Sequence, residues 1–357
     1  MALTSFGVND ALAVKLWSKK LDVEVLKETE IADYIGEDEN SIIQIKTETT
    51  KSAGDKITFG LRMQLSSPGI SGDNTLEGNE EALTTYSDYV MIDQLRHAVI
   101  SAGRMSEQRV PFSIRQHALD GLKDWWTDRI ATSIFNQLCG YTVQTDTRFT
   151  GLNSAIAPSS GMQIWAGGSA TTDDTIGAAD ILTLRDIDRC VELAQVMTPA
   201  MRPVMIRGNK HWVLFIHPYQ AFQLRQSAAA AGSWFDIQKA AVQGGEVTGN
   251  PIFKGALGMY NNCIIRVDSR IPYGCDNSTG LVAQTSVRRA VFCGAQAAVI
   301  AFGKDNGPGR FTWVEKKFDY DNQLGVSSAS IFGIVKTQFN SADFGSIVVS
   351  SYAAKHT

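Results

Sequence analysis

The sequence predicts an α+β fold in which strand-rich segments near both ends of the chain flank helices in its middle. Alternation of apolar and polar residues, which indicates half-buried strands, occurs in residues 41–49, 56–65, 311–318, 326–339 and 346–352. Apolar residues recur at every fourth position through much of 111–139, which indicates one long amphipathic helix. A chain of 357 residues is long enough for two or three domains.

Composition and charge exclude two broad classes of protein. The chain has 33 Lys and Arg against 37 Asp and Glu, and neither end carries a basic tail. We therefore do not expect this protein to coat nucleic acid by neutralising phosphates, although a neutral surface can still face nucleic acid. The N-terminal residues lack the apolar core of a signal peptide, and no apolar run approaches the roughly 20 residues that span a bilayer. We expect a protein made in the cytoplasm and without a membrane partner.

Cysteine spacing and motif searches indicate no cofactor and no catalytic machinery. The five cysteines are widely and irregularly spaced without a CxxC pair, so we expect free thiols rather than a zinc site or a disulfide framework. The nucleophile elbow, the zinc-protease motif and the phosphate-binding loop are also absent. We therefore predict no catalytic residue, no cofactor and no metal ligand.

The first segment predicts an amphipathic helix in an extended arm. Residues 9–27 can be capped by Asn9 or Asp10, and the polar stretch GEDEN follows soon after. The apolar residues near one face of this helix are Leu12, Leu16, Val23 and Leu26. Because the helix lies so close to the terminus, we expect an arm rather than part of a compact core.

The next segment predicts a β-ribbon followed by a long loop. Strands at 41–49 and 56–65 are separated by the turn Lys51–Asp55, and the loop SSPGISGDNTLEGNEE leads to a returning segment at 83–95. Extended ribbons with long loops are marginally stable alone. The ribbon therefore needs a surface to lie against, and another subunit can provide it.

The helical middle of the chain predicts a spine. In 111–139, Pro111 suits the first turn and Gly140 suits the left-handed position after the last turn. The recurring residues are Leu122, Trp126, Ile130, Ile134 and Leu138. Such a helix is roughly 40 Å long, which is long for a globular core. A second helix is predicted for 180–197, and 141–179 is expected to be a loop or insertion.

Two histidines bracket the apolar run in IRGNKHWVLFIHPYQAFQLR. If His211 to His217 is a strand, the two side chains share a face but lie roughly 20 Å apart. Ligands of one metal must each lie about 2 Å from it, so the two histidines cannot share a metal. Pro218 suits the first position of a following helix, which places His217 at a strand-to-helix junction. We interpret both histidines as structural.

The loop carries a cluster of acidic residues. Glu77, Glu80 and Glu81 can bind Mg²⁺ or Ca²⁺ through carboxylate oxygens. The alternative, which we favour, is a solvated loop that pairs with basic groups on a neighbouring subunit.

Several stretches together resemble one protein family. They are LAVKLWSKKL, IGEDENSIIQIKTETTKSAGDKITFGLRMQL, GISGDNTLEGNEEAL, IHPYQAFQLR, WFDIQKAAVQ and NPIFKGALGMYNNCIIR. The chain is similar over roughly residues 10–340 to major capsid proteins of tailed bacteriophages with the Hong Kong 97 fold, in the branch typified by phage N-four. The segments GDNTLEGNEE and NPIFKGALGMYNN carry most of the specificity.

The resemblance implies a division of the chain. An N-terminal arm would span residues 1–40, a β-ribbon with the extended E-loop 41–97, and a peripheral domain with its spine helix 98–179. An axial domain would span 180–303, and 304–357 would return to the peripheral sheet and end in a C-terminal tail. Contacts between subunits are then expected from Leu12, Leu16, Trp17, Glu77, Asn79, Glu80 and Glu81.

The resemblance also implies a function and partners. The protein would self-assemble as hexamers and pentamers into an icosahedral shell that encloses double-stranded DNA without sequence-specific binding. Portal protein, and scaffolding or decoration proteins, would be its other partners. It would be assembled in the host cytoplasm and reside in the virion capsid. Two alternatives are a soluble hydrolase-type enzyme that uses His217 with Glu77 or Glu80, and the shell of an encapsulin-like nanocompartment.

Removal of residues 1–27 is the first test of this interpretation. The truncated subunit is expected to fold and to unfold cooperatively on heating but to close shells poorly, because the apolar stripe of the arm would find its partner only on a neighbour. Electron microscopy of full-length and truncated protein checks this. Normal and equally stable shells from the truncated protein would contradict it.

Overall fold

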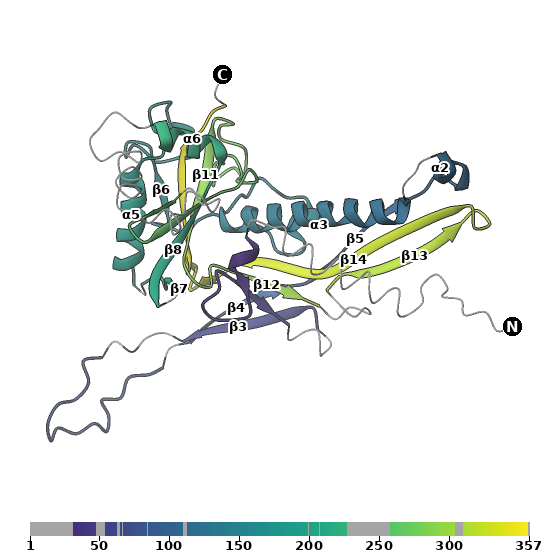
Figure 1. Cartoon of the computed structure of the whole chain (residues 1–357). Helices are drawn as coiled ribbons and strands as arrows, with labels where there is room; N and C mark the ends of the chain where they lie inside the picture. Colours follow the sequence, from purple (N-terminus) through teal and green to yellow (C-terminus); the bar gives the residue numbers. More distant parts are fainter. Residues whose placement is uncertain are drawn as a thin grey trace.

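The chain is built from two sheets joined by one long helix (Figure 1). The computed structural model describes residues 31–47, 54–62, 65, 67–83, 85–109, 113–198, 200–206, 208–226, 258–303 and 310–355. A compact body contains one sheet, and an elongated part contains the other (Figure 1). A third feature, a two-stranded ribbon with a long loop, projects away from both (Figure 1).

The sheet of the elongated part has six strands and the order β1-β2-β12-β14-β13, with β5 also paired to β14. Its members are β1 (Ile35–Gly36), β2 (Ile43–Lys46), β5 (Asp93–Ile100), β12 (Ala298–Phe302), β13 (Thr312–Phe318) and β14 (Gln323–Lys336). The strand β14 is long enough to pair with β12 near its end and with β5 and β13 along the rest. β14 therefore pairs with three of the other strands of this sheet and holds them together.

The sheet of the compact body has seven strands and the order β6-β17-β11-β8-β10-β9, with β7 paired to β8. Its members are β6 (Gln163–Trp165), β7 (Val204–Ile206), β8 (Asn209–Ile216), β9 (Gly258–Tyr260), β10 (Cys263–Val267), β11 (Val287–Cys293) and β17 (Ser346–Tyr352). Helices α5 (Leu184–Val196) and α6 (Pro218–Gln226) pack against Leu214 and Phe292 on one face. Phe215 and Val291 on the other face pack against the long helix. Burial on both faces explains the continuous apolar run of β8.

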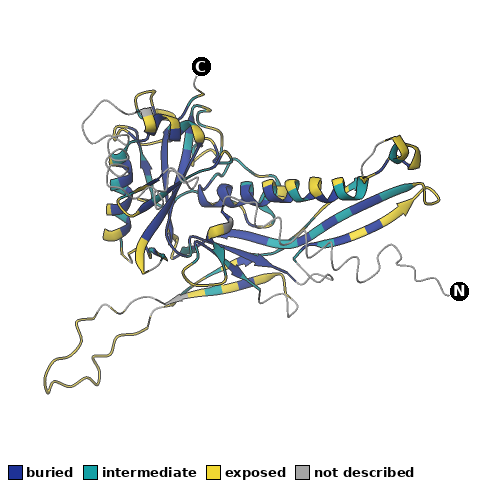
Figure 2. Ribbon diagram, viewed as in Figure 1, coloured by how far each residue is buried: buried dark blue, intermediate teal, exposed yellow. Residues whose placement is uncertain are grey.

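The long helix α3 (Ile114–Leu138) contacts both sheets. Near its middle, Trp126 packs edge-on against Phe311 and donates a hydrogen bond from Nε1 to Ser328 of β14 at 3.1 Å. Near its end, Phe135 packs against Phe215 of β8 with ring centroids 5.6 Å apart. Its 25 residues span about 37 Å. The helix therefore packs on one sheet near its middle and on the other near its end, which fixes the relative positions of the two sheets (Figure 2).

The remaining described elements are short or form the projecting ribbon. The ribbon consists of β3 (Lys56–Arg62) and β4 (Thr85–Met91) in antiparallel register. Its inner side packs through Ile57 and Phe59 on Val90 and Phe339. The short elements are η1 (Ala32–Tyr34), α2 (Arg104–Arg109), α4 (Thr147–Thr150), η3 (Asp173–Thr175), β15 (Gln338–Phe339) and β16 (Ala342–Asp343).

Several predicted elements are confirmed with shifted ends. The spine helix begins at Ile114 rather than at 111, and Pro111 lies outside the described residues. Gly140 has the predicted left-handed backbone, with φ of 60°. The second helix covers 184–196 of the predicted 180–197, and the strand-to-helix junction at His217 is confirmed. The predicted helix at 9–27 lies outside the described residues.

Three predictions about pairing were wrong. The segments 41–49 and 56–65 do not pair with each other: β2 runs parallel to β12, whereas β3 pairs with β4 across the long loop. The segment 141–179 contributes β6 to a sheet rather than forming only a loop. β17 joins the seven-stranded sheet instead of returning beside β13 and β14. Alternation shows which side of a strand is buried but does not identify its partner.

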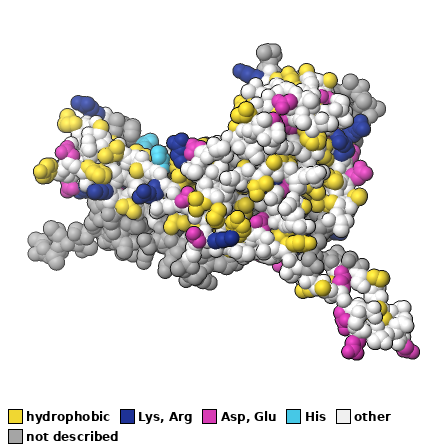
Figure 3. Space-filling model, turned by 180° about the vertical axis from the view of Figure 1, so that it is seen from behind, with side chains coloured by type: hydrophobic (Ala, Val, Ile, Leu, Met, Phe, Trp, Pro, Cys, Tyr) yellow, Lys and Arg dark blue, Asp and Glu magenta, His cyan; other side chains and the backbone are white. Residues whose placement is uncertain are grey.

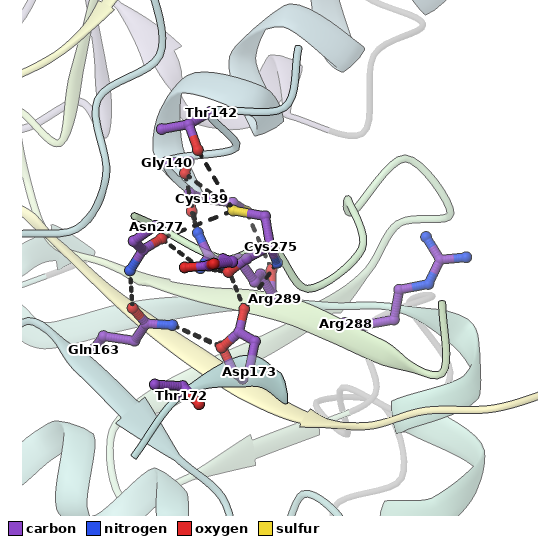
Figure 4. Close-up of polar contacts among 12 residues, drawn as sticks. Cys139, Gly140, Thr142, Gln163, Thr172, Asp173, Cys275, Asn277, Arg288 and Arg289 are labelled. Carbon is purple, nitrogen blue, oxygen red and sulfur yellow. Dashed lines mark hydrogen bonds and ion pairs between the residues drawn. The ribbon is translucent and has the colours of Figure 1, made fainter. Parts of the chain in front are cut away.

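A buried ion pair fixes the segment that was expected to be a loop (Figure 4). Arg289 of β11 is fully buried, and its Nε lies 2.7 Å from Asp173 Oδ2 in η3. The guanidinium also donates to the carbonyls of Gly140 and Cys275, at 3.0 and 2.7 Å, and to Asn277. Asp173 in turn accepts from Gln163, Trp165 and the Cys275 backbone. Both charged groups are thus hydrogen-bonded, which offsets the free-energy cost of removing them from water.

Arg289→Ala is expected to lower the free energy of unfolding of the unassembled subunit by about 3–5 kcal/mol, because it leaves Asp173 buried without its cation. Urea titration followed by tryptophan fluorescence measures this. The control is Arg225→Ala, at an exposed position of α6, which is expected to change stability by less than about 0.5 kcal/mol. Equal small losses in both variants would contradict the structural role of the ion pair.

Candidate assembly surfaces

His217 is a helix-capping residue. Its Nδ1 accepts a hydrogen bond from the backbone N–H of Tyr219 at 3.2 Å, and Gln220 Oε1 accepts from the backbone N–H of His217 at 2.8 Å. These reciprocal bonds satisfy donors at the start of α6 in the manner of a capping box. Burial, and then the nearby positive charge of Arg288, lowers the pKa of His217 to about 4. The imidazole is therefore neutral near pH 7, as the cap requires.

The structure does not bring the acidic loop to His217. α6 lies at the top of the compact body, whereas the loop lies at the end of the ribbon of β3 and β4, below that body (Figure 1). Within the described part of the chain, no group of three or more His, Cys, Asp or Glu side chains is arranged to hold a metal. The described helices include none long and apolar enough to cross a membrane. Burial raises the pKa of the Cys139 thiol to about 12 and also raises that of Cys190, so neither is a reactive thiolate.

The described part of the projecting loop, residues 67–83, is shaped by its own hydrogen bonds. The carboxylate of Glu81 accepts from the Ser67 N–H at 2.7 Å and joins the two sides of the loop. Glu80 accepts from the Gly78 N–H at 2.8 Å, and the Asn79 side chain donates to the Thr75 carbonyl at 3.1 Å. Three of the predicted contact residues therefore define the course of the loop backbone.

The same loop exposes apolar and acidic side chains together. Leu76 is 61% exposed and Leu83 56%, although a monomer gains nothing by presenting leucines on a projecting loop. The acidic residues of 65–83 are Asp73, Glu77, Glu80 and Glu81, and the segment contains no Lys or Arg. Figure 3 shows these acidic groups along the projection. The loop is thus an acidic surface with apolar positions, suited to a complementary basic and apolar one.

The predicted contact residues fall into two groups. Glu77, Asn79, Glu80 and Glu81 all lie in the exposed loop. Leu12, Leu16 and Trp17 lie outside the described residues. Whether either group contacts another subunit stays a prediction.

A second exposed surface, on the elongated sheet, was not predicted from the sequence. One face of β5, β14 and β13 packs toward α3, and the opposite face is exposed or half-buried (Figure 2). On that face Ile100 is 58% exposed and Val314 49%. The signal in the sequence was present, because Thr312–Phe318 places apolar residues at both alternating positions.

His217→Asn is expected to make the subunit less sensitive to acid. In the wild type, the folded-state pKa near 4 lies below the unfolded value near 6.5, so the stability contribution is complete above pH 6.5 and is lost as the pH falls toward 4. The loss is at most about 3 kcal/mol. Asparagine can still accept from the Tyr219 N–H but does not titrate. Urea titrations at pH 7, 6, 5 and 4 measure the difference.

Arg225→Ala, at an exposed position of α6 away from the cap, is the control. It is expected to retain the wild-type dependence of stability on pH. If His217→Asn showed the wild-type slope as well, the acid sensitivity would not arise from the cap.

Comparison with known proteins agrees with this geometry. A family model described as phage capsid protein matches residues 5–355. The major capsid protein of Pseudomonas phage KPP25 is 29% identical over 95% of this chain and 94% of its own. The solved capsid of Ralstonia phage GP4 is 35% identical, with TM-score 0.78 and 100% of both chains covered. The cyanophage Pam1 capsid has 20% identity and TM-score 0.71 over 93% of this chain and 94% of its own. The chain therefore belongs to the phage capsid protein family and has the Hong Kong 97-type fold.

Proposed function

We propose that this chain is the major capsid protein of a tailed phage and self-assembles into the icosahedral shell that encloses its double-stranded DNA. The observation that carries the proposal is the projecting ribbon, whose loop exposes leucines and carboxylates far from the body of its own subunit (Figure 1). The loop buries no side chain within its own subunit. In a lattice of many copies it gains a neighbour at every position.

The two sheets suit the axial domain and the peripheral domain of a shell subunit. The compact body with the seven-stranded sheet fits the axial domain, although its strands β6 and β17 come from outside the expected range 180–303. The elongated part with α3 and β14 fits the peripheral domain. The arm of residues 1–40, with Leu12, Leu16 and Trp17, and the loop residues Glu77, Asn79, Glu80 and Glu81 would then contact neighbouring subunits. Hexamers and pentamers would repeat the same contacts around different axes.

Other partners follow from a shell that is filled with DNA. A net charge of -4 suits a container that faces DNA without binding it tightly or reading its sequence. A portal protein would occupy one opening of the shell, and scaffolding or decoration proteins would act during or after closure. The protein would assemble in the host cytoplasm and reside in the virion. We assign it no catalytic role.

Electron microscopy of the purified protein, expressed alone and then with its neighbouring genes, tests the proposal. Uniform closed shells tens of nanometres across are expected, and packaged DNA distinguishes a genome container from a compartment that holds an enzyme. Small discrete oligomers under every condition would overturn the proposal.

Replacement of residues 67–83 by a short Gly-Ser linker is expected to abolish shells while the subunit still folds. The loop contributes no buried side chain in the described structure, so the melting temperature of the unassembled subunit is expected to change by less than about 3 °C. Calorimetry and electron microscopy measure the two effects. Shells of normal yield without the loop would show that it is not an assembly contact.

A further inference from the structure

Two consecutive arginines of β11 point to opposite sides of the strand and have different surroundings. The guanidinium of Arg289 is compensated by Asp173 and by backbone carbonyls. Arg288 points away from that network (Figure 4). Its Nη1 donates to the carbonyl of Ile271 at 2.8 Å, and its Nε is buried without a hydrogen-bond partner. Within the described residues Arg288 forms no ion pair, so its charge is left without a counter-charge.

Tyrosines rather than carboxylates surround Arg288. The guanidinium lies over the ring of Tyr273, 3.7 Å from its centre. Burial lowers the pKa of Arg288, and the described groups that act on that pKa besides burial are the phenols of Tyr273, Tyr219 and Tyr141. These tyrosines come from the segment between β10 and β11, from the start of α6 and from the turn after α3. Three separate parts of the chain thus bring phenols to one half-buried cation, and we call this group the tyrosine–arginine cluster.

The tyrosine–arginine cluster is suited to an anion. Burial raises the pKa of Tyr141, so its hydroxyl keeps its proton near pH 7 and can donate a hydrogen bond. Tyr273 is 37% exposed, so the cluster reaches the surface of the compact body. The N-terminus of α6 lies beside it, because Gln220 donates to the carbonyl of Arg288 at 3.2 Å, and a helix N-terminus adds positive potential. A partly exposed guanidinium with hydroxyl donors around it favours an oxyanion.

We propose that the tyrosine–arginine cluster is a phosphate-binding site. The guanidinium of Arg288 donates to oxygens of the phosphate, and the tyrosine hydroxyls donate to the remaining oxygens. A carboxylate also matches a guanidinium, but its two oxygens leave fewer acceptors for the surrounding hydroxyls. The phosphate comes either from solution or from the backbone of enclosed DNA. Only the second source rests on the proposed function.

Thermal unfolding of the full-length, unassembled subunit with inorganic phosphate tests the site. About 20 mM phosphate at pH 7, against chloride of equal ionic strength, is expected to raise the melting temperature of the wild type by about 2 °C. Arg288→Gln is expected to lose this shift, and Tyr273→Phe, which keeps the ring under the guanidinium, to lose about half of it. Arg225→Gln, at an exposed position of α6, is the matched control for a general salt effect and is expected to keep the whole shift.

An equal shift in the wild type and all three variants, or no shift in the wild type, would overturn the site and leave the shell function standing. Acetate that stabilised the wild type as much as phosphate would also overturn it, because the cluster would then recognise carboxylates.

A short DNA duplex distinguishes the two sources of phosphate. If the ligand is the DNA backbone, fluorescence anisotropy at low salt is expected to give Arg288→Gln a Kd at least threefold above that of Arg225→Gln. Equal Kd values, together with the phosphate-dependent shift, would assign the site to free phosphate. Absence of shells from the wild type would overturn the proposed function and would leave the phosphate site standing.

Discussion

Burial of α3 against two different sheets is the interaction on which the rest of the structure depends. Trp126 packs on the side of β14, and Phe135 packs on the side of β8. Because protein interiors are close-packed, a helix held at both places sets the spacing and angle between the sheets. The compact body, the elongated part and the projecting ribbon therefore keep one arrangement, which identical copies in a closed shell require.

Two buried ion pairs hold segments that contain few apolar side chains. Arg289 with Asp173 ties the irregular segment after α3 to β11, and Lys336 with Asp343 ties the end of β14 to the short hairpin that follows. Lys336 also donates to the carbonyls of Ile156 and Ala157. Removal of one member of either ion pair would leave the other member buried without a counter-charge. These pairs fix loops that have too few apolar side chains to fix themselves.

The described subunit leaves two chemically different surfaces exposed. The loop of residues 67–83 is acidic and carries leucines. The face of β5 and β13 that points away from α3 carries Arg96 and Lys316 beside the exposed Ile100, Val314 and Phe318. Neither surface is covered within a single copy, so both are candidates for contacts between copies.

The sequence by itself determined the class of most elements, the spine helix with Gly140 after its last turn, the strand-to-helix junction at His217 and the family of the chain. These follow from local periodicity, backbone preference and matching stretches, which are properties of neighbouring residues. Tertiary structure decided that β2 pairs with β12, that β17 joins the compact body and that Arg289 meets Asp173. The reason is physical: alternation reports which side of a strand is buried, whereas partners far apart in the chain are chosen by packing of the whole molecule.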